Sequence, residues 1–212
     1  MLRAAGEIVE AEVDGLREGE AGGLLLVLVG VVALAFAAFA GAYLGAGKRH
    51  LTPETTGGFL RPPGSRVPPF SLVNQDGARV TGAQGTAVYA FIYSHCEDTC
   101  PLEVQQIKGA LDDLGHDIPV IGVSVDPAND TAASARAFLI KQTMTGRMDF
   151  LLGSRAELEP LWRAFGVAPE TKGREHSAGV VVVDGEGRQR VGFPASQLTP
   201  ERLTADLRRL GA

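Results

Sequence analysis

From residue 67 onward, short apolar runs alternate with longer segments in which apolar residues recur at helical spacing. The runs AVYAFIY (87–93) and PVIGVSVD (119–126), and the shorter FLLG (150–153), are typical of buried strands. Helices are predicted in PLEVQQIKGALDDLG (101–115), in residues 131–141 and in SRAELEPLWRAFG (154–166). This region of the chain is therefore expected to alternate strand and helix.

The predicted helices carry end signals and apolar stripes. Pro101 suits a first helical turn, and Gly115 is typical of a helix C-terminus. Ser154 and Glu157 have the spacing of a capping box, although Pro160 follows in the second turn. Two stripes are expected to face the core: Val104, Ile107, Leu111 and Leu114 in the first helix, and Leu158, Leu161, Trp162 and Phe165 in the third.

Two β-hairpins complete the pattern. One is predicted in PPFSLVNQDGARV, turning at Asp76-Gly77, and the other in GVVVVDGEGRQRVGF, turning at residues 184–187. A last helix follows, with Thr199 as N-cap and Pro200 at its first position. Alternating strands and helices predict an α/β fold with a mixed sheet flanked by helices. With a cysteine pair after the first buried strand, this is the plan of a thioredoxin-like domain.

The N-terminal part divides by composition into three segments. Residues 1–20 are expected to form a short acidic tail, and residues 21–47 contain no charged residue. Residues 48–66 are rich in Gly, Pro and Thr and are interpreted as a flexible linker. Residues 67–212 then form the predicted folded domain.

The uncharged segment exceeds the length of about 20 apolar residues that a helix needs to cross a membrane. A cleaved signal peptide is an alternative, because Ala38 and Ala40 resemble a cleavage site. A buried core helix rarely stays apolar on every side for this length. A single uncleaved N-terminal transmembrane helix is the preferred interpretation.

The orientation of this helix receives conflicting indications. Lys48 and Arg49 directly follow the span, with Arg61 and Arg66 further on, whereas only Arg3 and Arg17 precede it. The positive-inside rule therefore favours a cytoplasmic C-terminal side. The cysteine chemistry favours the opposite side, and we expect a single-pass protein of the cell membrane with its C-terminal domain extracytoplasmic.

Both cysteines of the chain lie in YSHCEDTCP (93–101), at the predicted junction of strand and helix. A helix N-terminus favours thiolate over thiol, and the spacing of Cys96 and Cys100 brings both sulfurs within a few ångströms. A structural disulfide here would close a very small loop and add little stability. Two buried hydrophobic cysteines are the other plain alternative. The pair is therefore expected to exchange disulfides or to bind one metal ion.

A third ligand would distinguish these two chemistries. His50 lies in the linker and His116 after the first helix, and His95 is expected to point away from its neighbour Cys96. His176 precedes a strand, in a loop that approaches the cysteine helix in thioredoxin-like folds. Thiolates select Cu(I), a Cys₂His set also holds Cu(II), and zinc would require more ligands.

Four segments resemble the Sco (SenC) family of thioredoxin-like, copper-binding proteins that serve cytochrome c oxidase assembly. They are YSHCEDTCP, GVSVDPANDT, LLGSRAELEPLWRAFGV and HSAGVVVVDGEG, and the similarity covers about residues 67–210. The resemblance implies that Cys96, Cys100 and His176 bind copper as Cu(I) or Cu(II). Asp98 matches the acidic residue that the family carries between the cysteines. Asp126 and Asp130 match its V-D-P-x-x-D-T segment, and we expect them to shape the loop and its charge, with direct ligation by either one as the alternative.

The resemblance favours a metallochaperone over an enzyme. The expected partners are the copper-site subunit of cytochrome c oxidase and a thioredoxin-like reductase. Three departures from the family pattern put the identity of the partner in question: Glu97 replaces a usual proline, Gly179 replaces a larger residue, and the segment between Val167 and His176 is short.

Other functions use the same residues. A thiol–disulfide reductase would use Cys96 and Cys100 as its redox-active pair and would not need His176. A copper or redox sensor is compatible with the same ligands. A peroxiredoxin-like peroxidase is disfavoured, because Tyr93 stands where such enzymes carry threonine. The net charge of −5 gives no indication of a nucleic-acid surface.

Overall fold

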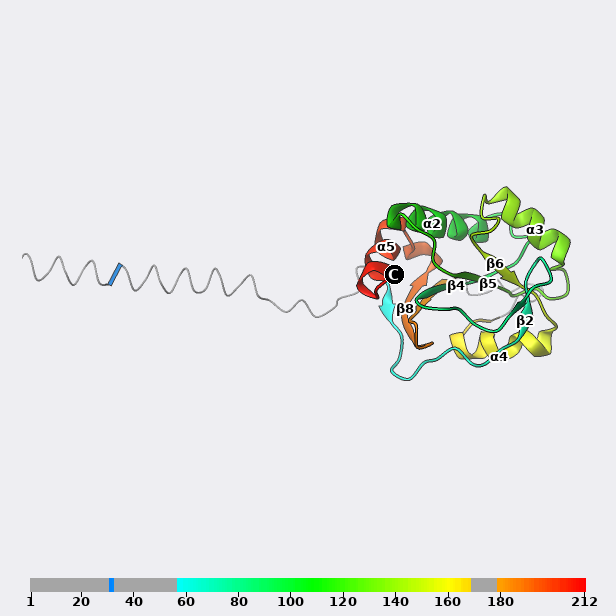
Figure 1. The fold of residues 1–212 in the computed structure, drawn as a ribbon, viewed down its shortest axis with the longest axis horizontal. Helices are drawn as coiled ribbons and strands as arrows, with labels where there is room; N and C mark the ends of the chain where they lie inside the picture. The colour runs from blue at the N-terminus through cyan, green and yellow to red at the C-terminus, as the bar shows by residue number, and fades with distance from the viewer. Residues whose placement is uncertain (1–30, 33–56, 169–178) are drawn as a thin grey trace, which may run out of the picture. The chain divides into compact units, whose positions relative to one another are not determined.

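The computed structural model describes residues 31–32, 57–168 and 179–212 (Figure 1). The chain divides into two compact units, residues 1–52 and 53–212, and the second contains the folded domain. In the described ranges, no helix combines the length and the apolarity needed to cross a membrane. Most of the apolar segment 21–47 lies outside these ranges, and so does His176.

A six-stranded mixed sheet forms the centre of the domain, in the order β1-β8-β7-β4-β5-β6. β4, β5 and β6 run parallel, whereas β7, β8 and β1 pair antiparallel. Their bounds are Phe59–Leu60 (β1), Ala87–Ile92 (β4), Val120–Ser124 (β5), Asp149–Leu151 (β6), Gly179–Val183 (β7) and Gln189–Pro194 (β8). A separate hairpin joins β2 (Leu72–Val73) to β3 (Arg79–Val80), turning at the predicted Asp76-Gly77.

Helices cover both faces of the sheet, as the alternating pattern predicts. α2, α3 and α5 lie on one face and α4 on the other (Figure 1). Their bounds are Thr99–Leu114 (α2), Ala132–Lys141 (α3), Arg155–Phe165 (α4) and Pro200–Arg209 (α5), with a short 3₁₀ turn η1 at Ala195–Gln197. The predicted caps are present: Ser154 and Glu157 form a capping box, Gly115 ends α2 in the left-handed conformation, and Thr199 caps α5.

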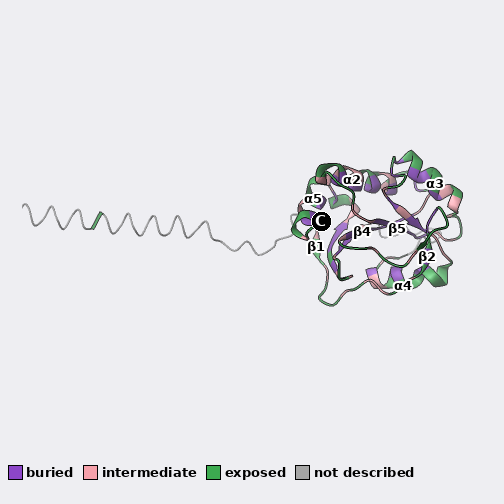
Figure 2. Ribbon diagram, in the orientation of Figure 1, coloured by how far each residue is buried: buried purple, intermediate pink, exposed green. Residues whose placement is uncertain are grey.

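Two hydrophobic cores follow from this layering. Along β4, Val88, Ala90 and Ile92 pack against α2, α3 and α5, whereas Tyr89 and Phe91 pack toward α4. Because both faces of β4 are buried, its sequence shows a continuous apolar run, not an alternating one (Figure 2). The described residues of both cores lie between positions 72 and 207, within unit 53–212.

One strand lies where the composition predicted only linker. In β1, Phe59 pairs with Gly192 and Leu60 with Val191, which adds a sixth strand to the sheet edge. Arg61 then donates a hydrogen bond to the Phe165 carbonyl oxygen at 3.0 Å. A two-residue strand has no periodicity that a sequence pattern can show, and its position depends on a partner far along the chain.

Candidate functional site

The cysteine loop begins where β4 ends and occupies residues 93–98 before α2. β4 and β5 are parallel, so the segments after them leave the sheet at the same edge. The Val125 amide donates to the Ile92 carbonyl oxygen at 3.0 Å, which continues this pairing beyond β5. The sheet therefore brings the cysteine loop next to the segment that contains Asp126 and Asp130.

Asp130 fixes the start of the cysteine loop. Its Oδ1 accepts hydrogen bonds from the Ser94 amide at 2.8 Å and the Ser94 hydroxyl at 2.6 Å. Its Oδ2 accepts a hydrogen bond from the Ser124 hydroxyl, at the end of β5. Asp126 accepts from Asn129 and stabilises the turn itself. Both aspartates thus have the loop-shaping contacts that the family resemblance implied.

Cys96 supplies the acceptor that a polar side chain usually provides at a helix N-terminus. The backbone amide of Cys100 donates to Cys96 Sγ at 3.2 Å. Asp98, the N-cap residue of α2, makes no side-chain capping bond. The first amides of a helix lack intrahelical partners, so a sulfur in this position satisfies one of them and gains from the helix dipole. Both thiols are free and buried.

The two cysteines differ in acidity. The Cys100 thiol donates a hydrogen bond to Cys96, and this contact, with the Cys100 amide and Tyr93, lowers the pKa of Cys96 to about 5 despite its burial. The same hydrogen bond, together with burial, raises the pKa of Cys100. At neutral pH the site therefore holds one thiolate, on Cys96, and one thiol, on Cys100.

A carboxylate that sequence reasoning missed lies on the same face of α2. Glu103 is 1% exposed, and neither carboxylate oxygen has a hydrogen-bond partner among the described residues. Burial, and secondly the negative charge of Cys96, raise the pKa of Glu103 to about 8. A signal was present in the sequence: Glu103 is three residues after Cys100 and four before Ile107, and so shares their buried face.

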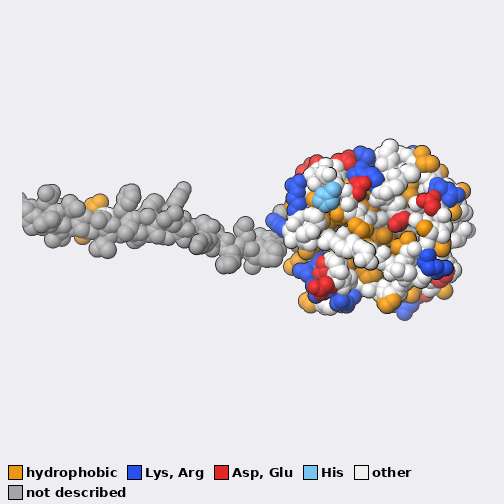
Figure 3. Space-filling model, in the orientation of Figure 1, with side chains coloured by type: hydrophobic (Ala, Val, Ile, Leu, Met, Phe, Trp, Pro, Cys, Tyr) orange, Lys and Arg blue, Asp and Glu red, His pale blue; other side chains and the backbone are white. Residues whose placement is uncertain are grey.

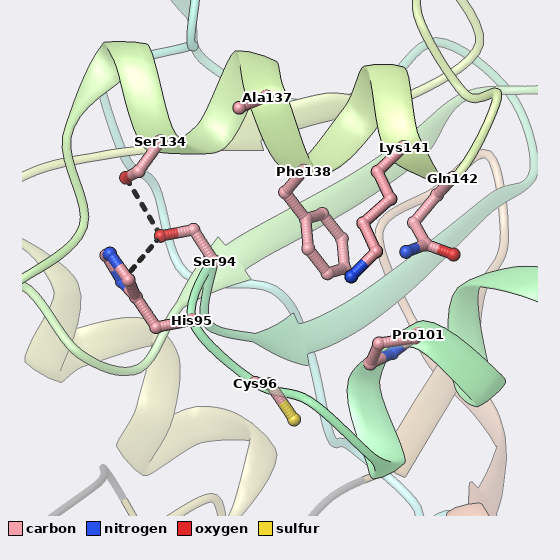
Figure 4. A pocket seen from close by; sticks show the side chains of 9 residues that line it. All are labelled: Ser94, His95, Cys96, Pro101, Ser134, Ala137, Phe138, Lys141 and Gln142. Atoms are coloured by element: carbon pink, nitrogen blue, oxygen red, sulfur yellow. Dashed lines mark hydrogen bonds between the residues drawn. The ribbon is translucent and has the colours of Figure 1, made fainter.

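A cavity of about 230 Å³ opens beside Cys96, and we call it the Cys96 cavity. Figure 4 shows side chains reaching toward it from α3, with Cys96 and Pro101 on the opposite side. Ser94 joins the two sides, because its hydroxyl bonds both His95 Nδ1 and Ser134 Oγ. The lining consists of Ser94, His95, Cys96, Pro101, Ser134, Ala137, Phe138, Lys141 and Gln142.

The structure places most of the histidines and acidic residues singled out in the sequence. His95 and His116 are exposed, as is Asp98. His95 also lines the Cys96 cavity, but its ring is directed toward Ser94 and away from the Cys96 sulfur (Figure 4), as its position next to Cys96 predicted. In the part of the chain that is described, no three His, Cys, Asp or Glu side chains form a group able to hold a metal ion. His176, the predicted third ligand, lies outside that part, so its placement stays a prediction.

The described surface carries both signs of charge. Acidic and basic side chains are interspersed on the face shown in Figure 3, with exposed hydrophobic atoms between them. Binding to a polyanion requires a clustered basic surface, and this face has none.

Sequence comparison identifies relatives of the folded domain. The family model described as SCO1/SenC matches residues 61–212. Protein SenC of Rhodobacter capsulatus is 33% identical over 104 residues, which is 46% of this chain and 46% of that protein. The mitochondrial SCO1 homolog 1 of Arabidopsis thaliana is 30% identical over 106 residues, 47% of this chain and 31% of that protein. The chain thus spans less than half the length of these two curated relatives.

Solved structures share the fold. The structure of Bradyrhizobium japonicum ScoI with copper bound is 30% identical, with a TM-score of 0.58, and covers 68% of this chain and 99% of that one. A SCO1/SenC family lipoprotein from Bacillus anthracis has a TM-score of 0.63 at 23% identity, covering 73% of this chain and 100% of that one. The mixed α/β, thioredoxin-like fold predicted from the sequence is thereby confirmed. Since the family model covers well over half of the sequence, the chain belongs to the SCO1/SenC family.

Proposed function

We propose that this chain is a membrane-anchored copper-binding protein that delivers copper to the copper site of cytochrome c oxidase during assembly. Cys96 and Cys100 are the sulfur ligands in this proposal, and His176 is the third. The observation that carries it is the pair of free thiols at one helix N-terminus, with Cys96 Sγ 3.2 Å from the Cys100 amide. Family membership and the copper-bound ScoI structure support it.

The cysteine pair has the properties that a copper carrier needs. Two sulfur donors close together suit Cu(I), and an added imidazole suits either oxidation state. Cys96 is a thiolate at neutral pH, so one ligand is ready, whereas Cys100 loses its proton as the metal enters. Copper is the cargo, and the protein shields both sulfurs from solvent until a partner takes the copper.

Anaerobic copper titration of the reduced domain, residues 53–212, tests the proposal. We expect one copper ion per chain, and at least about tenfold weaker binding in Cys96→Ser, Cys100→Ser and His176→Ala. His116→Ala is the matched control, because His116 is exposed and lies beyond the C-terminal end of α2. A double Cys→Ser variant that binds copper as tightly as the parent would refute the proposal. An unchanged affinity in His176→Ala would remove only the third ligand.

A thiol–disulfide reductase is the second candidate function, and the acidity of the cysteine pair favours it. A thiolate at Cys96 that lines a cavity, backed by a buried thiol at Cys100, suits attack on a partner's disulfide. Catalytic reduction of a protein disulfide by the copper-free domain, without measurable copper binding, would identify this function. In the copper carrier, a thioredoxin-like reductase has to keep the same pair reduced, because a disulfide cannot bind the metal.

The membrane anchor and its orientation belong to the same proposal. Residues 21–47 form the anchor, and the domain is extracytoplasmic, where an oxidase copper site would be met. The Lys and Arg residues after the span favour the opposite orientation. An alkaline phosphatase fused after residue 212 decides between them, because this reporter folds only outside the cytoplasm. We expect an active fusion, and an inactive one would overturn the orientation.

A further inference from the structure

The Cys96 cavity has a charge that copper binding does not use. Lys141 is the one Lys or Arg in its lining, and the lining contains no carboxylate. Within the described residues, no ion pair or hydrogen bond joins Lys141 to another side chain. Figure 4 shows its side chain extending from α3 beside Phe138 toward the cysteine loop. A negatively charged group that enters the cavity would therefore meet the Lys141 ammonium, and the Cys96 thiolate is the one anion in the described lining.

The size of the cavity suits side chains of a protein partner. The cavity volume of about 230 Å³ is below the roughly 300–1,000 Å³ of typical small-molecule sites. A cavity of this size accommodates one or two side chains of a partner protein.

We propose that the Cys96 cavity receives an acidic, cysteine-bearing segment of the partner protein. A carboxylate of that segment pairs with Lys141, and the partner's sulfur comes to lie beside Cys96. The inference rests on the proposed function, because a protein that transfers copper must bring its own metal ligand close to a metal ligand of the acceptor protein. Docking of the segment itself requires no copper.

Disulfide exchange with synthetic peptides measures this docking. In the full-length Cys100→Ser chain, held in a non-ionic detergent, Cys96 is the only thiol. The probes are peptides of equal length whose single cysteine carries a thionitrobenzoate disulfide and is flanked by Glu, Gln or Lys. The Cys96 thiolate attacks the peptide sulfur, one disulfide replaces another, and thionitrobenzoate leaves as a coloured thiolate. The rate of colour release reports how well each peptide reaches the cavity.

We expect the Glu peptide to react about threefold to fivefold faster than the Gln peptide, the effect of one exposed ion pair, and the Lys peptide to react slowest. Lys141→Gln should abolish this order and Lys141→Glu should reverse it. Lys108→Glu is the control, because it changes the net charge by the same amount as Lys141→Glu. Lys108 lies about two helical turns after Pro101 in α2 and does not line the cavity. A peptide order that Lys141→Glu leaves unchanged would overturn the proposal.

Two further measurements distinguish the proposed partner segment from other occupants of the cavity, and failure of this proposal from failure of the proposed function. If the thionitrobenzoate disulfide of glutathione shows the same dependence on Lys141 as the Glu peptide, the site is one for small acidic thiols, and the proposal is wrong. Copper titration of Lys141→Glu with both cysteines present should give the parent affinity, since Lys141 is not a ligand. If the parent chain fails to bind copper, the proposed function is refuted. The docking proposal is tested separately, because the order of the peptide rates is measured without copper.

Discussion

Replacing Glu103 by glutamine should stabilise the domain at alkaline pH and have little effect at acid pH. Glu103 is 1% exposed, and its carboxyl group has no hydrogen-bond partner in the part of the chain that the structure describes, so its charged form is poorly solvated. Its pKa rises from the ordinary 4.5 to about 8 through burial and then through the charge on Cys96. Glutamine has nearly the same shape and never ionises, so the substitution removes the charge and keeps the packing.

The magnitude follows from linkage between protonation and folding. Between pH 4.5 and 8 the folded domain retains a proton on Glu103 that the unfolded chain has released, so the contribution of Glu103 to stability falls as the pH rises. At about 1.4 kcal/mol for each pH unit, the loss reaches about 5 kcal/mol above pH 8 and about 3 kcal/mol at pH 7. In Glu103→Gln this loss is absent. The free-energy advantage of the variant should therefore grow steadily across this range.

Urea unfolding of residues 53–212 from pH 4.5 to 9, with excess reductant and a metal chelator, measures the difference. Both proteins contain the same cysteines, so the difference between their free energies of unfolding isolates Glu103. Glu159→Gln serves as the control, because Glu159 is exposed and paired only with Arg163. A difference between Glu103→Gln and the parent that stays within about 1 kcal/mol at every pH would refute the raised pKa.

Three further outcomes test the site. Asp130→Asn replaces the charged acceptor of three hydrogen bonds from Ser94 and Ser124, and should cost about 2 kcal/mol in urea unfolding; no loss would mean that the loop needs no anchor. Trp162→Phe leaves the buried Ser124 carbonyl without its donor and should cost about 1–3 kcal/mol by the same measurement; a neutral change would show that the bond is dispensable. Because the pKa of Cys96 is about 5, its alkylation by iodoacetamide should reach a plateau by about pH 6, as followed by mass spectrometry; a rate still rising at pH 8 would contradict this.

Local chemistry made most of the fold predictable from the sequence. Gly115 ends α2 and Ser154 begins α4 through bonds to residues three or four positions away, so short motifs identify them. β4 reads as one continuous apolar run because α2 and α4 lie on opposite faces of it. The cysteine pair was predictable for the same reason, since both members belong to one strand-to-helix junction.

The remaining features depend on contacts between distant segments. Phe59 and Leu60 form a strand only because β8, more than 130 positions later, offers a free edge. Lys141 reaches the cysteine loop only because α3 packs beside α2, where Gln105 binds the Gln142 carbonyl oxygen. Glu103 is different. Its spacing from Cys100 and Ile107 predicts that it lies on the buried face of α2, but no neighbouring residue in the sequence indicates that its carboxylate lacks a partner. Tertiary packing alone decides that.

Cys96 and Glu103 also oppose each other in the pH dependence of stability. The pKa of Cys96 falls from 9 to about 5 on folding, so this thiolate stabilises the domain increasingly as the pH rises from 5 to 9. Glu103 does the reverse between 4.5 and 8. From pH 5 to 8 the two contributions have opposite signs, so the parent domain should show a weaker pH dependence of stability than either single variant. Stability should then rise with pH in Glu103→Gln and fall in Cys96→Ser. The cavity-side thiolate and the buried carboxyl group therefore form one electrostatic unit, in which the cost of burying one charge offsets the gain from the other.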